Sequence, residues 1–240
     1  MLKEAIEKIE ELNRPTFKQV DNTVYGDKPM SIITHVKPRI KTVDVSGLPG
    51  LVTLVKTETL PRHALDGPAY VEVASPTEVR VFTDLDEDLD RDVWYVARAD
   101  VPGFKSGYRS YEEFVIELRS RFRETDGSRY LLDLLGRMDI TESSTSEDNG
   151  ITQGVTVRQG VALKGQEMVR PIVPLAPYRT FFDVEQPVSE FLVRVDQKGS
   201  VGLFEADGGM WKREAKMRLT EFLIDAFADE IKAKTVQVLF

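Results

Sequence analysis

The chain contains no cysteine, and this absence removes several kinds of chemistry at once. Without a thiol there is no disulfide, no thiolate nucleophile and no cysteine-ligated zinc or iron–sulfur site. Histidine is almost as scarce, with two residues in 240. The common sequence signatures of nucleotide-binding loops, serine hydrolases and zinc proteases do not occur either. No compact set of nucleophile, base and orienting group therefore emerges from the sequence.

Long hydrophobic runs are missing too. No stretch approaches the 18 or so apolar residues of a membrane span, and the charged start of the chain does not resemble a signal peptide. We therefore expect a cytoplasmic protein with no membrane partner. With 41% apolar and 30% charged residues, the chain can bury a core of its own.

Neither sign of charge dominates either half of the chain. The formal charge is −8, and residues 1–120 hold 16 basic and 21 acidic side chains, against 16 and 19 in 121–240. Proteins that bind the phosphate backbone usually carry a basic domain or stripe, because many Lys and Arg contacts supply their affinity. Nucleic acid is therefore not the favoured partner.

The first hundred residues combine one helix with a β-rich region. Residues 2–12 place apolar side chains at helical spacing, and Pro15 ends the pattern. Between 17 and 99, short β-prone segments alternate with Gly and Pro. The predicted strands are 31–36, 39–45, 51–57, 69–74, 78–83 and 93–98. We expect the second and third of these to form a hairpin.

A helical spacer is predicted over 110–137. Ser110 and Glu113 form a capping box, and apolar residues at helical spacing then predict a helix over 110–123. The sequence Asp126-Gly127-Ser128 is expected to interrupt it. Leu131–Leu135 should form a second, shorter helix that ends at Gly136.

The region 139–240 combines strands with one long helix. The polar cluster 141–149 is interpreted as a strand edge and turn, followed by β structure near Val155 and Val157. Prolines 171, 174 and 177 favour an extended polyproline-like crossing. Strands 190–196 and 200–206 should pair, and a helix of roughly 20 residues should start at Met210.

Together these patterns predict an α+β fold in a single domain over 1–240. We expect mostly antiparallel sheets with an N-terminal helix, a central helix pair and a long C-terminal helix. The β-prone segment 236–240 has no obvious partner within its own chain, so it is expected to pair with an exposed sheet edge, its own or that of a neighbour, and the edge of a neighbour is favoured. The predicted oligomer contacts are Ile6, Ile9, Val236, Val238 and Phe240.

Acidic residues supply the candidate metal ligands. The residues Asp84, Asp86, Asp88, Asp90 and Asp92 alternate, which would place five carboxylates on one face of an extended segment. The first three match an EF-hand loop, but Leu89 and Tyr95 stand where that loop needs Gly and Glu. We favour a solvated acidic loop, with contact to a divalent ion or a basic partner as the alternative.

Two further sets of polar residues have a structural and a catalytic interpretation. Glu205 and Asp207 would share a strand face, where paired carboxylates can act as acid and base or hold Mg²⁺. The same sequence suits a strand-to-helix turn with Asp207 near a capping position, which we favour. His35, His63 and Asp66 form a metal site only if paired strands bring them together. No cofactor is predicted.

Basic and aromatic residues gather between positions 158 and 194. They are Arg158, Lys164, Arg170, Tyr178, Arg179, Phe181, Phe182 and Arg194. Such a surface suits single-stranded nucleic acid or nucleotides. Arginine and aromatic residues also dominate protein–protein contacts, and we favour assembly or core packing for this set.

Several segments between 108 and 230 follow one another in a characteristic order. They are Tyr111–Val115, Leu131–Leu135, Gly150–Gln153, Val155–Val157, Pro177–Phe181 and Leu203–Gly209. This order resembles the YfdQ-like family of uncharacterised phage and prophage proteins. The resemblance implies a bacteriophage origin, the cytoplasm of a host cell and an accessory role near recombination or counter-defence functions. It implies no catalytic residues.

Three functions remain open at this point. The favoured one is a non-enzymatic phage accessory protein that forms a homo-oligomer, as a scaffold, shell or counter-defence factor, with a host or phage protein as a further partner. The second is a nucleic-acid or nucleotide-binding module in phage recombination or immune evasion. The third is metal-dependent hydrolysis through Glu205, Asp207 and the run Asp84–Asp92.

Overall fold

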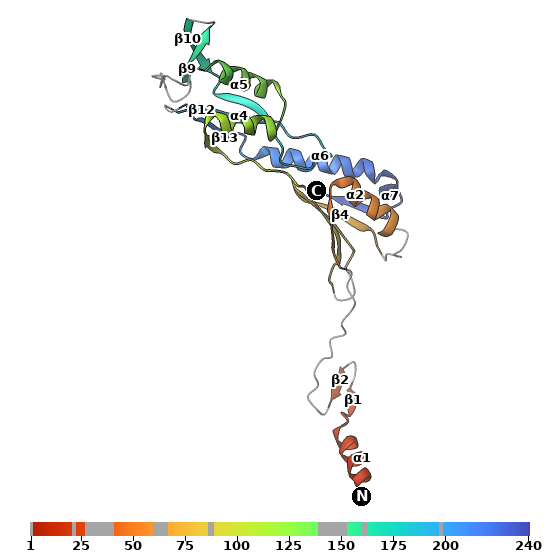
Figure 1. Cartoon of the computed structure of the whole chain (residues 1–240). Coiled ribbons are helices and arrows are strands. Elements are labelled where there is room, and N and C mark those ends of the chain that lie inside the picture. The colour runs from red at the N-terminus through yellow and green to blue at the C-terminus, as the bar shows by residue number, and fades with distance from the viewer. Residues whose placement is uncertain are drawn as a thin grey trace. The chain divides into compact units, whose positions relative to one another are not determined.

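The computed structural model describes residues 2–20, 23–26, 41–59, 67–85, 89–138, 153–159, 163–196 and 199–240 (Figure 1). The chain divides into two compact units, Met1–Arg39 and Ile40–Phe240, where the sequence led us to expect a single domain. The predicted strand 31–36 and the polar cluster 141–149 lie outside the described residues.

The described part of the smaller unit, residues 2–20 and 23–26, contains one helix and one pair of strands. Helix α1 (Leu2–Asn13) confirms the helix predicted over 2–12. Strands β1 (Phe17–Val20) and β2 (Thr23–Gly26) pair antiparallel. Along the polar side of α1, Lys8 donates a 2.7 Å hydrogen bond to Glu11. Ile6 and Ile9, on its apolar side, are both exposed.

The larger unit contains two five-stranded sheets. The first sheet has the strand order β14-β4-β5-β6-β3. Its strands are β3 (Val43–Ser46), β4 (Ala69–Ser75), β5 (Glu78–Phe82), β6 (Val93–Arg98) and β14 (Val236–Leu239). The three central strands are antiparallel, whereas β14 joins β4 and β3 joins β6 in parallel. The strands predicted at 69–74, 78–83 and 93–98 are confirmed.

Helices complete the core of the first sheet. They are α2 (Leu48–Leu54), a π-helical turn η1 (Val55–Thr59), α6 (Met210–Ala226) and α7 (Ala228–Lys232). Leu51, Leu219 and Phe227 from these helices are buried in one cluster with Val71 and Val81 of the sheet. The long helix predicted from Met210 is thus confirmed, and it packs against β4 and β14.

Three expectations for the first sheet are wrong: the strand at 51–57, its hairpin with 39–45, and the pairing of 236–240 with a neighbour. Residues 51–57 are helical rather than a strand, because Leu48, Leu51 and Val55 repeat at helical spacing and are fully buried. Strand β3 therefore pairs with β6 instead of forming a hairpin. The segment 236–240 does have a partner in its own chain, since β14 pairs with β4 and buries Val236.

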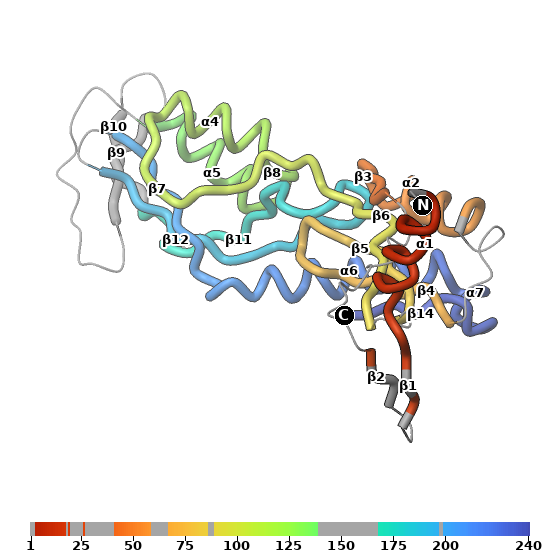
Figure 2. Tube along the Cα trace, turned by 90° about the horizontal axis from the view of Figure 1, so that it is seen from below, coloured from red at the N-terminus to blue at the C-terminus, as the bar shows by residue number. Residues whose placement is uncertain are grey.

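The second sheet is antiparallel throughout, with the order β7-β13-β12-β11-β8 (Figure 2). Its strands are β7 (Gly107–Arg109), β8 (Phe122–Arg123), β11 (Ile172–Pro177), β12 (Ser189–Val195) and β13 (Val201–Glu205). Helices α4 (Tyr111–Ser120) and α5 (Asp126–Arg137) pack on it through a second core that includes Phe114, Leu131, Phe191 and Leu203. A separate hairpin joins β9 (Gln153–Gln159) to β10 (Leu163–Val169). The α+β class is confirmed.

Three boundaries in the second half differ from the prediction. Helix α4 ends at Ser120 because Phe122 and Arg123 pair with β11. Helix α5 already begins at Asp126, since Thr125 and Ser128 form a capping box there, and it continues past Gly136. Pro174 and Pro177 lie within β11 rather than in a polyproline-like crossing. The predicted pairing of 190–196 with 200–206 is confirmed by β12 and β13.

A row of charges crosses three strands of the first sheet. Glu78 on β5 accepts hydrogen bonds from Arg80 at 2.6 Å and from Arg98 on β6 at 3.1 Å. Arg98 also pairs with Asp44 on β3. The hydrogen bond from Arg80, together with that from Arg98, holds the pKa of Glu78 below its ordinary value of 4.5. The folded state therefore favours the ionised carboxylate.

Acid should weaken this row and with it the fold. A carboxyl group whose pKa is lowered by folding stabilises the protein fully above its unfolded pKa, and the contribution disappears as the pH falls through the lower folded pKa. We expect the urea concentration at the midpoint of unfolding to decrease as the pH is lowered below about 4.5. In Glu78→Gln this decrease should be less steep. Glu112→Gln on the exposed side of α4 controls for the lost charge. Equal acid dependence of wild type and Glu78→Gln would contradict the assignment.

Candidate functional site

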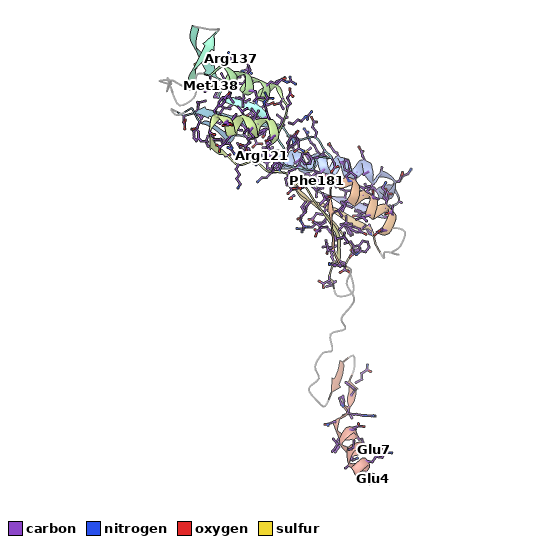
Figure 3. All side chains as sticks on the ribbon, in the orientation of Figure 1. Glu4, Glu7, Arg121, Arg137, Met138 and Phe181 are labelled. Atoms are coloured by element: carbon purple, nitrogen blue, oxygen red, sulfur yellow. The ribbon has the colours of Figure 1, made fainter. Side chains whose placement is uncertain are left out.

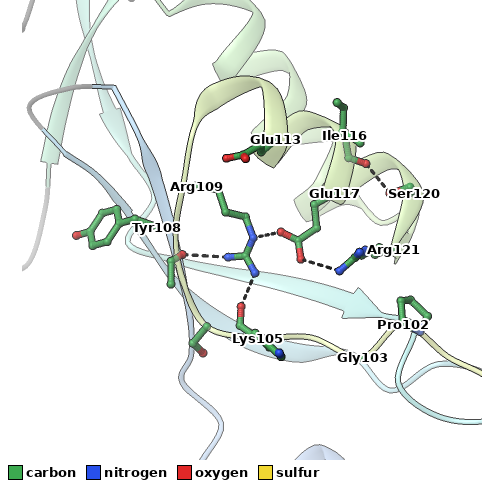
Figure 4. A pocket seen from close by; sticks show the side chains of 12 residues that line it. Pro102, Gly103, Lys105, Tyr108, Arg109, Glu113, Ile116, Glu117, Ser120 and Arg121 are labelled. Atoms are coloured by element: carbon green, nitrogen blue, oxygen red, sulfur yellow. Dashed lines mark hydrogen bonds and ion pairs between the residues drawn. The ribbon is translucent and has the colours of Figure 1, made fainter.

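A broad hollow of about 700 Å³ lies beside β7 and α4 (Figure 4). Arg109 is at its centre: it forms an ion pair with Glu117 of α4 and donates to the carbonyls of Gly107 at 3.1 Å and Lys105 at 2.5 Å. Glu117 also approaches Arg121, at 4.0 Å. These contacts brace β7 against α4.

The carboxylates of this hollow serve the fold. Glu113 completes the capping box of α4, where it accepts from the backbone N–H of Ser110 at 3.1 Å and from its hydroxyl at 2.8 Å. Those two bonds lower the pKa of Glu113. Because Glu113 caps α4 and Glu117 is paired with Arg109, neither carboxylate of this hollow is free to act as a catalytic acid or base.

A smaller hollow of about 350 Å³ is lined by the buried Arg179 together with Thr77, Phe104, Glu205 and Trp211. Arg179 is only 3% exposed. Its Nη1 donates to Glu205 Oε1 at 2.8 Å and its Nη2 donates to Ser189. The guanidinium lies 4.0 Å from the centre of the Trp211 ring, in cation–π geometry.

Burial sets the electrostatics of this cluster. Desolvation lowers the pKa of Arg179 to about 10, against the opposing effect of the nearby carboxylates of Glu205 and Asp207. Arg179 therefore stays cationic at neutral pH. Within the described part of the chain, Arg179 Nε and Trp211 Nε1 are buried without a hydrogen-bond partner. Each such donor typically costs about 1–3 kcal/mol.

The segment around Arg179 joins the two cores. Thr180 donates from its hydroxyl to the carbonyl of Pro76, next to the first sheet, at 2.6 Å. The side chain of Gln186 hydrogen-bonds the backbone of 179–181. Phe181 is buried in the first core, and Figure 3 shows it where the two parts of the larger unit meet. Arg179 and its partners thus stabilise a joint between the sheets.

The structure does not assemble the predicted basic and aromatic residues into one surface. Arg179 and Phe181 are buried, whereas Arg170 is exposed and lies 4.4 Å from the centre of the Tyr130 ring. The rings of Tyr178 and Phe182 contact each other at 5.3 Å. Arg158 and Lys164 are opposite each other on the β9–β10 hairpin, and Arg194 lies on β12.

The candidate metal ligands are engaged elsewhere or lie outside the described residues. Glu205 pairs with Arg179. Asp207 accepts from the backbone N–H of Gly209 at 3.0 Å and of Trp211 at 3.1 Å, so the capping interpretation is confirmed. Asp84 lies 3.7 Å from Arg91. Residues Asp86, Asp88, His35, His63 and Asp66 are not among the described ones, and across those that are, no three His, Asp or Glu side chains form a group that could hold a metal.

The predicted oligomer contacts divide into exposed and buried residues. Ile6 and Ile9 are 51% and 59% exposed, and Phe240 is exposed as well, with Lys216 Nζ 5.0 Å from its ring centre. Val236 is buried and Val238 is half-buried in the first core. None of the described helices is long and apolar enough to cross a membrane.

Sequence reasoning missed one apolar surface. Met210, Met217 and Ile224 are exposed along the outer side of α6, opposite the buried Ala215, Leu219 and Leu223. Their seven-residue spacing is visible in the sequence, but we interpreted only the apolar residues of this helix that pack against the sheet.

Comparison with known proteins adds no functional assignment. No family model, curated protein or solved structure matches this chain.

Proposed function

We propose that this is a non-enzymatic bacteriophage accessory protein that self-associates, with the apolar side of α1 as a contact between copies. The exposure of Ile6 and Ile9 carries this proposal. The phage context rests on the resemblance of residues 108–230 to the YfdQ-like family.

The size of the smaller unit supports the proposal. An isolated helix of the length of α1 is marginal in water, and so is a lone two-stranded hairpin. A unit of this size seldom buries enough apolar surface to be stable alone. Covering Ile6 and Ile9 with an apolar partner surface would supply the missing burial.

The pattern of α1 suits a second copy of itself. Four of the five apolar positions of α1, namely 2, 5, 9 and 12, are symmetric about Glu7, and Ile6 lies at the edge of the same side. Two antiparallel α1 helices that meet through this side, with a two-fold axis between them, would therefore bring Ala5 of one copy near Ile9 of the other. Apolar positions of the two copies match in this arrangement, and the charged side of each α1 helix faces away from the contact.

The test is the mass of the protein in solution. Light scattering at micromolar concentration should give a wild-type mass above the 27.2 kDa of one chain, and Ile6→Glu with Ile9→Glu should lower it. Ionised carboxylates on the apolar side of α1 cannot be buried without a large desolvation cost. Ile116→Glu on α4 controls for a charge placed on an exposed apolar site. A monomeric wild type would refute the proposal.

A further inference from the structure

Helix α6 is apolar on two opposite sides. Ala215, Leu219 and Leu223 are buried against the first sheet. Figure 2 shows α6 along the margin of the larger unit, and on its outer side Met210, Met217 and Ile224 are 63%, 46% and 47% exposed. Residues seven apart lie two turns apart on nearly the same side of a helix. A surface helix normally has a polar outer side, so an apolar stripe there marks a contact surface.

The stripe is symmetric about Met217. Met210 and Ile224 lie seven residues before and after it, and the exposed Arg213 and Glu221 lie four residues before and after it. In an antiparallel pair of α6 helices with a two-fold axis at Met217, Met210 of one copy contacts Ile224 of the other. The same axis places Arg213 beside Glu221 of the other copy, twice per pair.

The charges select this orientation. A parallel pair of α6 helices would place Arg213 beside Arg213 and Glu221 beside Glu221, and like charges in contact are unfavourable. The antiparallel pair also aligns the helix dipoles favourably. The exposed ring of Phe240, next to Lys216 of α6, adds apolar area on one flank of the stripe.

We infer that the outer side of α6 is a self-association surface that binds α6 of a second copy in antiparallel orientation. The inference deepens the proposed function, on which it rests for the identity of the partner, and it adds a contact that does not involve α1. The surface consists of Met210, Arg213, Met217, Glu221 and Ile224.

The absence of cysteine makes a direct test clean. In Met217→Cys the new thiol is the only one in the chain, and the two-fold axis would bring two of them together. Under mild oxidation, we expect the covalent dimer to form at least about ten-fold faster than in Ile116→Cys, because pairing raises the effective thiol concentration. Ile116 is an apolar residue on another helix and is somewhat more exposed than Met217, at 59% against 46%, so exposure alone would favour the control. Equal rates of disulfide formation would overturn the inference.

Charge exchange provides a second readout that does not depend on the thiol at the axis. On the Met217→Cys background, Arg213→Glu alone and Glu221→Arg alone each place like charges together and should slow the cross-link. The double exchange restores opposite charges and should restore the rate. A double variant as slow as the single variants would contradict the antiparallel register.

The same cross-link separates the two proposals. In the variant Ile6→Glu, Ile9→Glu, the α6 contact should still allow Met217→Cys to form the covalent dimer. If this double variant has the same mass as wild type, the α1 contact is refuted, but the expected cross-link through α6 is unaffected. Conversely, Met217→Glu should lower the mass of the α1 variant to one chain. If Met217→Glu changes the mass of neither wild type nor the α1 variant, the α6 contact is wrong. The α1 contact is then tested separately by Ile6→Glu and Ile9→Glu.

Discussion

Replacing Arg179 by alanine is expected to destabilise the protein by about 3–5 kcal/mol, because a side chain that is only 3% exposed is lost together with its ion pair to Glu205. The change also removes the hydrogen bond to Ser189 and the stacking on Trp211, and it leaves a hole where the two cores join. Urea denaturation at pH 7 measures the loss. Arg170→Ala is the matched control, because Arg170 also lies over an aromatic ring but is exposed, and its loss should cost less than about 1 kcal/mol.

Two further variants separate charge from volume at this position. Arg179→Lys keeps the charge but loses the planar fork that reaches Glu205 and Ser189 together, so it should also be destabilising. Arg179→Met fills the space without a buried charge, while Glu205 is partly exposed and can turn to solvent. We expect Met to be tolerated better than Ala. An alanine variant as stable as wild type would show that Arg179 does not stabilise the joint.

Replacing Gly127 by alanine should be nearly as damaging, at about 3 kcal/mol, because it overpacks a site where backbone meets backbone. A Cβ at this position would lie 2.1 Å from the carbonyl oxygen of Pro174 and 2.8 Å from Val173 Cγ1. Both groups belong to β11, which is held by β12 on one side and β8 on the other. The first turn of α5 would have to move away from the sheet.

Gly136 in the same helix provides a control, because its replacement by alanine is expected to increase stability rather than decrease it. Apart from its own helix backbone and chain neighbours, no atom of the described residues lies within 4 Å of a Cβ built there. Gly136→Ala should therefore stabilise the protein by about 0.5–1 kcal/mol, through the better helix propensity of alanine. Thermal unfolding of both variants gives the comparison. A mild effect of Gly127→Ala, similar to that of Gly136→Ala, would mean that α5 does not pack so closely on β11.

Elements specified by neighbouring residues were predictable. The capping box of Ser110 and Glu113 marks the start of α4, and the capping role of Asp207 at α6 follows from the turn that precedes it. The antiparallel strands β4, β5 and β6 were located within a residue or two. In each case the pattern that defines the element lies within the element or next to it.

Elements specified by distant contacts were not predictable. Residues 51–57 include the β-branched Val52, Thr53, Val55 and Thr57, so local preference favours a strand, but burial of Leu51 and Val55 against the first sheet selects a helix. Arg179 looked like a surface residue because arginine is seldom buried. Its partners Ser189, Glu205 and Trp211 lie 10 to 32 residues away, and nothing local indicates that they converge.

The parallel pairing of β14 with β4 sets an order of events during synthesis. The first sheet brings residue 69 beside residue 236, whereas the core of the second sheet is formed by residues between 104 and 203. A nascent chain can close the second core while β14 is still inside the ribosome. The first core must wait with Val71 and Val81 uncovered, although β4, β5 and β6 emerge earlier. Pairing of strands so far apart in the sequence is also slow. The edge of β4 therefore stays unpaired, and open to pairing with other chains, until β14 has been synthesised and joins it.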